Sequence, residues 1–159
     1  MLPWEVIRKG DVRGRILADK HYTRQTPGHP MWTRPGYNFC LYCEDTKGGA
    51  VFVWWRPKWE ADIERKDKLR CLECTIFRNE TNWLSSDLVK VAVVALESVE
   101  AKLELHHENP AKLMLITGVG STKTIRGRSS KSLPGACFRY AGWKDFDHKS
   151  GKADVWLTI

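Results

Sequence analysis

Apolar and polar residues alternate in short blocks through the first half of the chain, a pattern typical of β-strands joined by tight turns. Two apolar runs, Asn38–Cys43 and Ala50–Trp55, flank the turn-forming stretch Asp45–Gly49. Together they predict a β-hairpin over Tyr37–Trp55. A third apolar run, Arg70–Arg78, predicts another strand.

Two segments show helical spacing instead. In Leu2–Asp19 a short first segment leads into a helix with Val12, Ile16 and Leu17 on one side. From Ser85 to His106 the apolar residues recur every three or four positions, at Leu88, Val89, Ala92, Val93, Leu96, Val99 and Leu103. Ser85, Ser86 and Asp87 supply the N-cap and the first turn of this long helix.

The rest of the chain adds short elements. Ala111–Thr117 predicts a strand, Pro134–Tyr140 a short helix that ends at Gly142, and Trp143–Phe146 and Val155–Ile159 two more strands. The charged stretch Glu60–Lys68 predicts a solvated connection, and His21–Pro30 a loop. The strand–helix–strand order from Arg70 to Thr117 predicts a parallel strand pair. We therefore expect a single α/β (α+β) domain with a mixed, partly parallel sheet flanked by helices.

Composition narrows the class of protein. The 159 residues suit one globular domain, with 42% hydrophobic and 28% charged residues. Lys and Arg number 26 against 19 Asp and Glu, so a net charge of +7 favours polyanionic partners. The chain has no run of 18 apolar residues and begins Met-Leu-Pro-Trp-Glu, without the order of a signal peptide. We expect a cytoplasmic protein with five reduced cysteines.

Two Cys-x-x-Cys pairs, Cys40/Cys43 and Cys71/Cys74, have the spacing of zinc ligands. Both pairs fall inside predicted strands, where residues three apart point to opposite faces of the sheet. Buried core thiols are therefore the favoured interpretation, a structural zinc site is the alternative, and we expect no metal.

Candidate reactive groups lie in two loops and at one helix end. His21, Tyr22 and Arg24 stand before a Pro-Gly turn, where His21 is either a general base or a packed surface residue. Residues 82–87 begin the long helix and offer backbone N–H groups to an anion, although every helix N-terminus does so and Ser caps are common for stability alone. The loop 121–132 is either a phosphate-binding segment or a solvated loop, with basic residues Lys123, Arg126, Arg128 and Lys131.

In this order the elements resemble the GNAT acyltransferase fold, from Arg13 to Ile159. The sharpest motif is Gly135-Ala136-Cys137-Phe138-Arg139-Tyr140-Ala141-Gly142-Trp143, which resembles the closing Ala-Gly-aromatic signature of that family. Two features depart from the family pattern. The segment 78–86 lacks the glycine-rich loop that holds the acyl-CoA pyrophosphate, and the family's tyrosine acid falls on Phe138, with Tyr140 offset.

A divergent branch of the fold fits these departures better. The sequence resembles phage Mom-type DNA-modification proteins, which share a GNAT-like core and alter adenine in DNA. The residues that carry this resemblance are the His-Tyr-x-Arg-x-x-Pro-Gly stretch at 21–28, Phe77-Arg78-Asn79-Glu80 and Gly142-Trp143. It implies transfer of a small acyl-derived group from acyl-CoA or a related donor onto a base amine.

The same resemblance, together with the motifs above, suggests which residues act in catalysis, in donor binding and in DNA binding. Catalysis is expected at His21, Tyr22, Arg78, Ser85 and Tyr140. Donor contacts are expected at Asn82, Ser85 and Ser86, and DNA contacts at Arg24, Trp32, Lys123, Arg126, Arg128 and Lys131. A flipped base needs aromatic side chains to receive it, and Trp32, Tyr37 and Trp83 fall in predicted loops.

Two other functional classes stay open on the sequence. One is an ordinary N-acetyltransferase acting on a small amine or a peptide. The other is a non-catalytic nucleic-acid-binding domain, with or without structural zinc.

Overall fold

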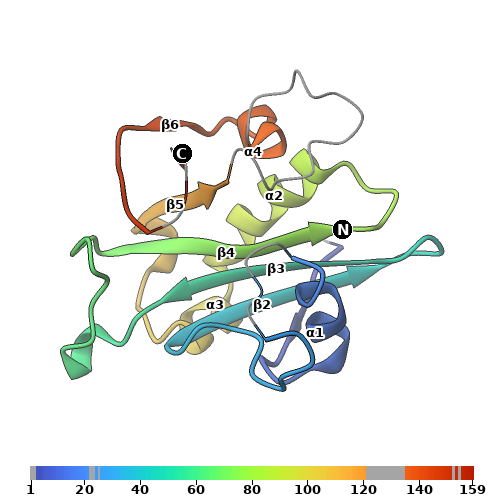
Figure 1. Cartoon of the computed structure of the whole chain (residues 1–159), viewed down its shortest axis with the longest axis horizontal. Coiled ribbons are helices and arrows are strands. Elements are labelled where there is room, and N and C mark those ends of the chain that lie inside the picture. Colours follow the sequence, from blue (N-terminus) through green and yellow to red (C-terminus); the bar gives the residue numbers. More distant parts are fainter. Residues whose placement is uncertain (1–2, 22–23, 25, 121–134, 152, 154) are drawn as a thin grey trace.

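A computed structural model of the chain describes residues 3–21, 24, 26–120, 135–151, 153 and 155–159. Its centre is a seven-stranded mixed sheet in the order β1-β2-β3-β4-β5-β7-β6 (Figure 1). The strands are β1 (Glu5–Ile7), β2 (Tyr37–Glu44), β3 (Gly49–Arg56), β4 (Cys71–Asn79), β5 (Met114–Val119), β6 (Lys144–Phe146) and β7 (Val155–Thr158). The helices are α1 (Val12–Ala18), α2 (Ser85–Val94), α3 (Val99–Glu104) and α4 (Ala136–Tyr140). Short 3₁₀ turns are η1 (Trp59–Ala61), η2 (Ala95–Glu97) and η3 (Pro110–Lys112).

The predicted hairpin is confirmed as β2 and β3, paired antiparallel from Tyr37 opposite Arg56 to Glu44 opposite Gly49. Strand β4 pairs antiparallel with β3, but the register shifts between Val53 and Trp54, which lie opposite Ile76 and Cys74. Thr75 is therefore the extra residue of a β-bulge in β4.

The predicted parallel pair is also confirmed. Strands β4 and β5 pair in parallel through four residues each, from Cys71 opposite Met114 to Cys74 opposite Thr117. Beyond that point β5 pairs only with β7 among the described strands. The last five residues of β4, Thr75–Asn79, thus leave β5 at the bulge.

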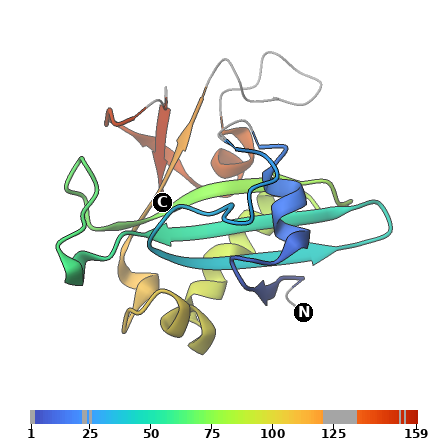
Figure 2. The ribbon, with the colours of Figure 1, turned by 60° about the horizontal axis from the view of Figure 1, so that its bottom comes forward.

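Helices cover both faces of the sheet. Helix α1 packs over one face, where Leu17 and Ala18 join a cluster with Val51, Val53 and Ile76. Helices α2, α3 and α4 pack over the other face, in the largest cluster, which holds Phe39, Phe52, Trp54, Leu72, Val89, Leu96, Leu105, Phe138 and Trp143. Figure 2 shows α1 and the α2–α3 pair on opposite sides of strands β2 to β4. None of the helices in the described part of the chain is both long and apolar enough to cross a membrane.

The prediction of one continuous helix over Ser85–His106 is wrong, because the segment is divided into α2, η2 and α3. It breaks after η2, where Ser98 is extended and its Oγ accepts the backbone N–H of Ala101 at 3.1 Å, which starts α3. Its expected N-cap is also wrong, because Leu84 holds the cap position without a side-chain hydrogen bond. The side chain of Ser85 is instead bonded to Asn79.

Three further expectations need correction. Val12 and Ile16 do not face the core: both are about half exposed, and α1 buries Gly14, Leu17 and Ala18 instead. The strand β1 was not expected. The connection Glu60–Lys68 is not wholly solvated, because the side chains of Arg65 and Asp67 within it are buried.

The C-terminal elements follow the prediction closely. Helix α4 begins after Gly135, a residue with φ of 73°, and ends before Gly142, with φ of 98°. Left-handed backbone of this kind favours glycine. Strands β6 and β7 then form an antiparallel pair at the edge of the sheet.

Candidate functional site

His21 lies just after α1, where its backbone N–H donates to the carbonyl of Ala18 at 2.9 Å. The side chain is partly buried. Burial, and to a smaller extent the positive charge of Arg78, lower its pKa to about 4. The imidazole is therefore neutral at pH 7, the form that can accept a proton.

Arg78 ties the end of β4 to the end of α1. Its Nε donates to Glu80 Oε2 at 2.6 Å and its Nη1 to the carbonyl oxygen of Lys20 at 3.3 Å. Lys20 Nζ donates to Glu80 Oε1 at 3.1 Å. We call His21, Lys20, Arg78 and Glu80 the His21 cluster. It joins two predicted catalytic residues, His21 and Arg78, at the part of β4 that has left β5.

Asn79 organises the connection between β4 and α2. Its Nδ2 donates to Ser85 Oγ at 3.0 Å and to the carbonyl of Trp83 at 2.7 Å. Its Oδ1 accepts from the backbone N–H and the hydroxyl of Thr81 at 2.9 and 2.6 Å. Ser85, the first residue of α2, is thereby tied to the last residue of β4, the neighbour of Arg78 in sequence.

The anion-binding site expected at the start of α2 is partly taken by a carboxylate of the protein itself. The backbone N–H of Asn82 donates to Asp45 Oδ2 at 2.7 Å, and this bond is the largest cause of a lowered pKa at Asp45. A carboxylate from the β2–β3 turn therefore stands where a donor phosphate was expected. Ser86 makes no hydrogen bond through its side chain within the described part of the chain.

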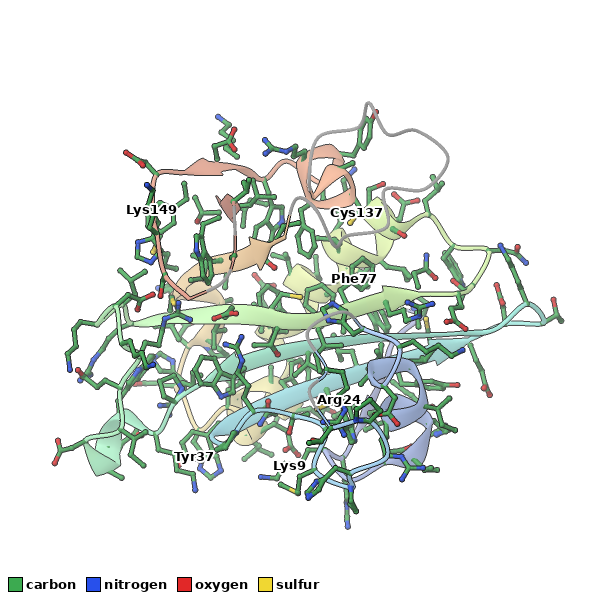
Figure 3. The ribbon with its side chains drawn as sticks, in the orientation of Figure 1. Lys9, Arg24, Tyr37, Phe77, Cys137 and Lys149 are labelled. Carbon is green, nitrogen blue, oxygen red and sulfur yellow. The ribbon has the colours of Figure 1, made fainter. Side chains whose placement is uncertain are left out.

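Tyr140 is not grouped with His21. It projects from α4 with 80% of its surface exposed, and α4 packs on the α2 side of the sheet through Phe138. Phe138, where the resemblance to GNAT enzymes would place a tyrosine acid, contacts Phe77 of β4 edge-on, with ring centroids 5.9 Å apart. Figure 3 labels Phe77 on β4 and Cys137 on α4.

The expectation that Trp32 receives a base is wrong. Trp32 is 3% exposed and packs in the cluster beneath α1. Gly14 makes room for it, since a Cβ at that position would lie 2.6 Å from the indole ring. The ring of Tyr37 already has a stacking partner, because it stacks on His106 with ring centroids 4.2 Å apart. Only Trp83 of the three proposed aromatics is well exposed, at 47%.

Arg24 is bound within its own loop. Its Nε pairs with Asp19 at 2.8 Å and its Nη2 donates to the carbonyl of His29 at 2.8 Å, and its side chain is 9% exposed. This placement does not suit a phosphate contact. Tyr22, Lys123, Arg126, Arg128 and Lys131 lie outside the described residues.

The structure has a pocket on the α1 face of the sheet that the sequence analysis did not predict. Its cavity, of about 360 Å³, is lined among others by Arg34, Trp55, Arg65, Glu73, Thr75 and Trp156. We call it the β4–β7 pocket, after the strands that supply Glu73, Thr75 and Trp156. One signal was present in the sequence, namely a carboxylate between Leu72 and Cys74 inside an apolar strand.

The charges of this pocket are paired with one another. Glu73 is 4% exposed, and its Oε1 accepts from Arg34 Nη1 at 3.2 Å and from Arg65 Nη1. Arg65 also pairs with Asp67 at 2.6 Å, and His148 Nε2 lies 3.0 Å from the same carboxylate. Arg65 holds the pKa of Asp67 well below its usual range.

The four cysteines of the Cys-x-x-Cys pairs are all buried in strands, as expected. They belong to four different clusters of the core, so their sulfurs are not gathered at one point. The described residues contain no group of three or more His, Cys, Asp or Glu that could hold a metal ion.

A comparison with family models, curated sequences and solved structures finds no match to this chain.

Proposed function

We propose that this chain is a transferase that modifies DNA, moving a small acyl-derived group onto the exocyclic amine of adenine, as its resemblance to Mom-type proteins implies. One observation carries the proposal: β4 leaves its parallel partner at the Thr75 bulge, and the His21 cluster lies beside the part that leaves.

The departing part of β4 suits an extended donor. Thr75–Asn79 has no strand partner on its β5 side among the described residues. A strand edge of this kind can hydrogen-bond the backbone-like amides of an extended ligand. The arm of acyl-CoA carries such amides, so this edge supports a donor of that type.

The acid–base requirement falls on His21. When an amine attacks a thioester carbonyl, a C–N bond forms, the C–S bond breaks, and the nitrogen loses one proton while the thiolate gains one. A neutral imidazole can take the proton from nitrogen and pass it to sulfur. Arg78, next to it, can stabilise negative charge that develops on the carbonyl oxygen.

The contacts around α2 refine the expected donor site. Ser85 and Ser86 remain candidates for the polar end of the donor. Asn82 is a weaker candidate, because its N–H already binds Asp45 and a phosphate would meet that carboxylate.

The test is mass spectrometry of nucleosides from the DNA of bacterial cells that express the chain. We expect a modified deoxyadenosine that is absent when the His21→Gln variant is expressed. Unmodified DNA together with acetylation of a small amine or a peptide would favour the ordinary N-acetyltransferase. DNA binding without any modification would favour the non-catalytic domain.

A further inference from the structure

We infer that the β4–β7 pocket receives the target base, a planar heterocycle that bears an exocyclic amine. The inference rests on the proposed function and adds where the acceptor binds.

Two indoles, of Trp55 and Trp156, form part of the wall of the pocket, beside charged and small residues. The guanidinium of Arg65 lies over both indoles, 5.9 Å from the ring centroid of Trp55 and 5.5 Å from that of Trp156. The half-exposed guanidinium of Arg34 also lies over Trp55, 5.1 Å from its ring centroid. Bases stack on aromatic rings and on guanidinium planes. The lining of the pocket therefore includes indole and guanidinium planes on which a base that has left the duplex can stack.

An unpartnered hydroxyl lies in the wall. Thr75 is 9% exposed, and its Oγ1 is buried with no hydrogen-bond partner among the described residues. A buried polar atom without a partner is costly and calls for an explanation such as a ligand. A hydroxyl can donate to a ring nitrogen or accept from an amine, and adenine presents both groups side by side.

The charge of the pocket favours a neutral ligand over an anion. Glu73 and Asp67 already pair with Arg65, and Arg34 pairs with Glu73. Lys66, in contrast, is exposed at the rim. Phosphates of the DNA backbone therefore fit the rim, and the uncharged base fits the interior.

Position links this pocket to the donor edge. Thr75 lines the pocket and is also the first residue of β4 beyond the pairing with β5. A base amine bonded near Thr75 would lie beside the edge proposed for the donor, as attack on the donor requires.

The experiment is photo-crosslinking of the full chain to a DNA duplex with one 8-azidoadenine opposite an abasic site, without a donor. Mass spectrometry then maps the crosslinked peptide. We expect crosslinks to the peptides that contain Trp55 or Arg34. Thr75→Val, which replaces the hydroxyl by a methyl group, should weaken binding of this duplex about fivefold.

Thr33→Val is the matched control. Thr33 is also buried, at 8% exposed, with an unpartnered Oγ1, but it does not line the pocket. Thr33→Val should bind like the natural chain, and Thr75→Ser should restore binding. Thermal unfolding of all three variants separates loss of the hydroxyl from loss of the fold.

The outcomes separate this inference from the proposed function. Crosslinks elsewhere, for example at Trp83, or equal weakening by both valine variants would overturn the pocket even if the DNA of expressing cells is modified. Crosslinks in the pocket with DNA that stays unmodified would keep the base site and overturn the transferase. Neither crosslinks nor modification would overturn both.

Discussion

His21 combines a reactive group with a setting that keeps it uncharged. Desolvation and the neighbouring Arg78 both penalise the imidazolium form. The backbone of this residue is anchored just after α1, where its N–H donates to the carbonyl of Ala18 at 2.9 Å.

His21→Gln should therefore reduce modification of DNA by roughly 10²–10⁴-fold, the usual loss for a general base. The affinity for DNA should stay within twofold of the natural chain, and the melting temperature should change little. The measurement is turnover and thermal unfolding on one preparation. Full activity in a stable variant would remove His21 from the mechanism.

The low pKa of His21 also predicts how stability depends on pH. An unfolded histidine titrates near 6.5, and the folded one near 4, so the unfolded chain binds more protons between these values. The free energy of unfolding should fall as pH drops from 6.5 to 4, by at most about 3 kcal/mol from this group. Denaturant unfolding across this range should show a smaller fall in His21→Gln, and identical curves would contradict the assigned pKa.

Sequence reasoning worked unevenly at this scale. It proposed His21 from its place before a Pro-Gly turn and Arg78 from the resemblance to Mom-type proteins; the structure brings the two side chains near each other, and their catalytic roles stay predictions. It placed Trp32 on the surface because a loop position does not reveal that Gly14, eighteen residues earlier, leaves room for an indole. Glu73 was missed as a pocket residue because its ion pairs with Arg34 and Arg65 form only when the fold brings these residues together.

At the scale of elements, the break between η2 and α3 depends on one side chain. Ser98 Oγ accepts from the N–H of Ala101 at 3.1 Å and donates to the carbonyl of Ala95 at 2.7 Å. It thus satisfies one group from each of the two helical segments that it separates.

Ser98→Ala should lower the free energy of unfolding by about 1 kcal/mol, the usual cost of a lost N-cap. Ser86→Ala is the control, because Ser86 lies in the first turn of α2 without a side-chain hydrogen bond in the described structure. Chemical denaturation of both variants measures the difference. Equal stabilities would mean that the apolar face of the segment, and not Ser98, sets the break.

The strands were predicted well and the irregularities poorly, for a physical reason. Hydrophobic periodicity reports which face is buried, so β2, β3, β4 and β5 were found within a few residues. A bulge such as that at Thr75 arises from the register against β3, which a single strand's sequence does not contain. The point where β4 leaves β5, at the centre of the candidate site, could therefore not be predicted from the sequence.

At the scale of the whole molecule, the two faces of the sheet carry different features. The His21 cluster and the β4–β7 pocket lie on the α1 face, while α2 and α3 cover the other. If DNA binds the α1 face, basic residues on that side contact phosphate and those on α2 and α3 do not. Lys66 lies at the pocket, and Lys149 is labelled in Figure 3 on the connection between β6 and β7.

Replacing Lys66 and Lys149 together by Ala should weaken DNA binding for all sequences. The slope of log affinity against log salt concentration should fall by about 2, since each phosphate contact contributes about 0.9. Replacing Lys90 and Lys102, exposed on α2 and α3, removes the same net charge and serves as the control. Equal slopes for the two double variants would place the footprint elsewhere.

The scattered cysteines give this protein a built-in set of reporters. Burial raises the pKa of Cys40 and Cys71 to about 12 and that of Cys43 and Cys137 to about 11. Alkylating reagents attack only the thiolate, so at neutral pH each sulfur reacts mainly when its surroundings open. Because Cys40, Cys43, Cys71 and Cys74 sit in four separate clusters, timed alkylation followed by peptide mapping would rank the opening rates of four parts of the core in the natural chain, without an introduced label.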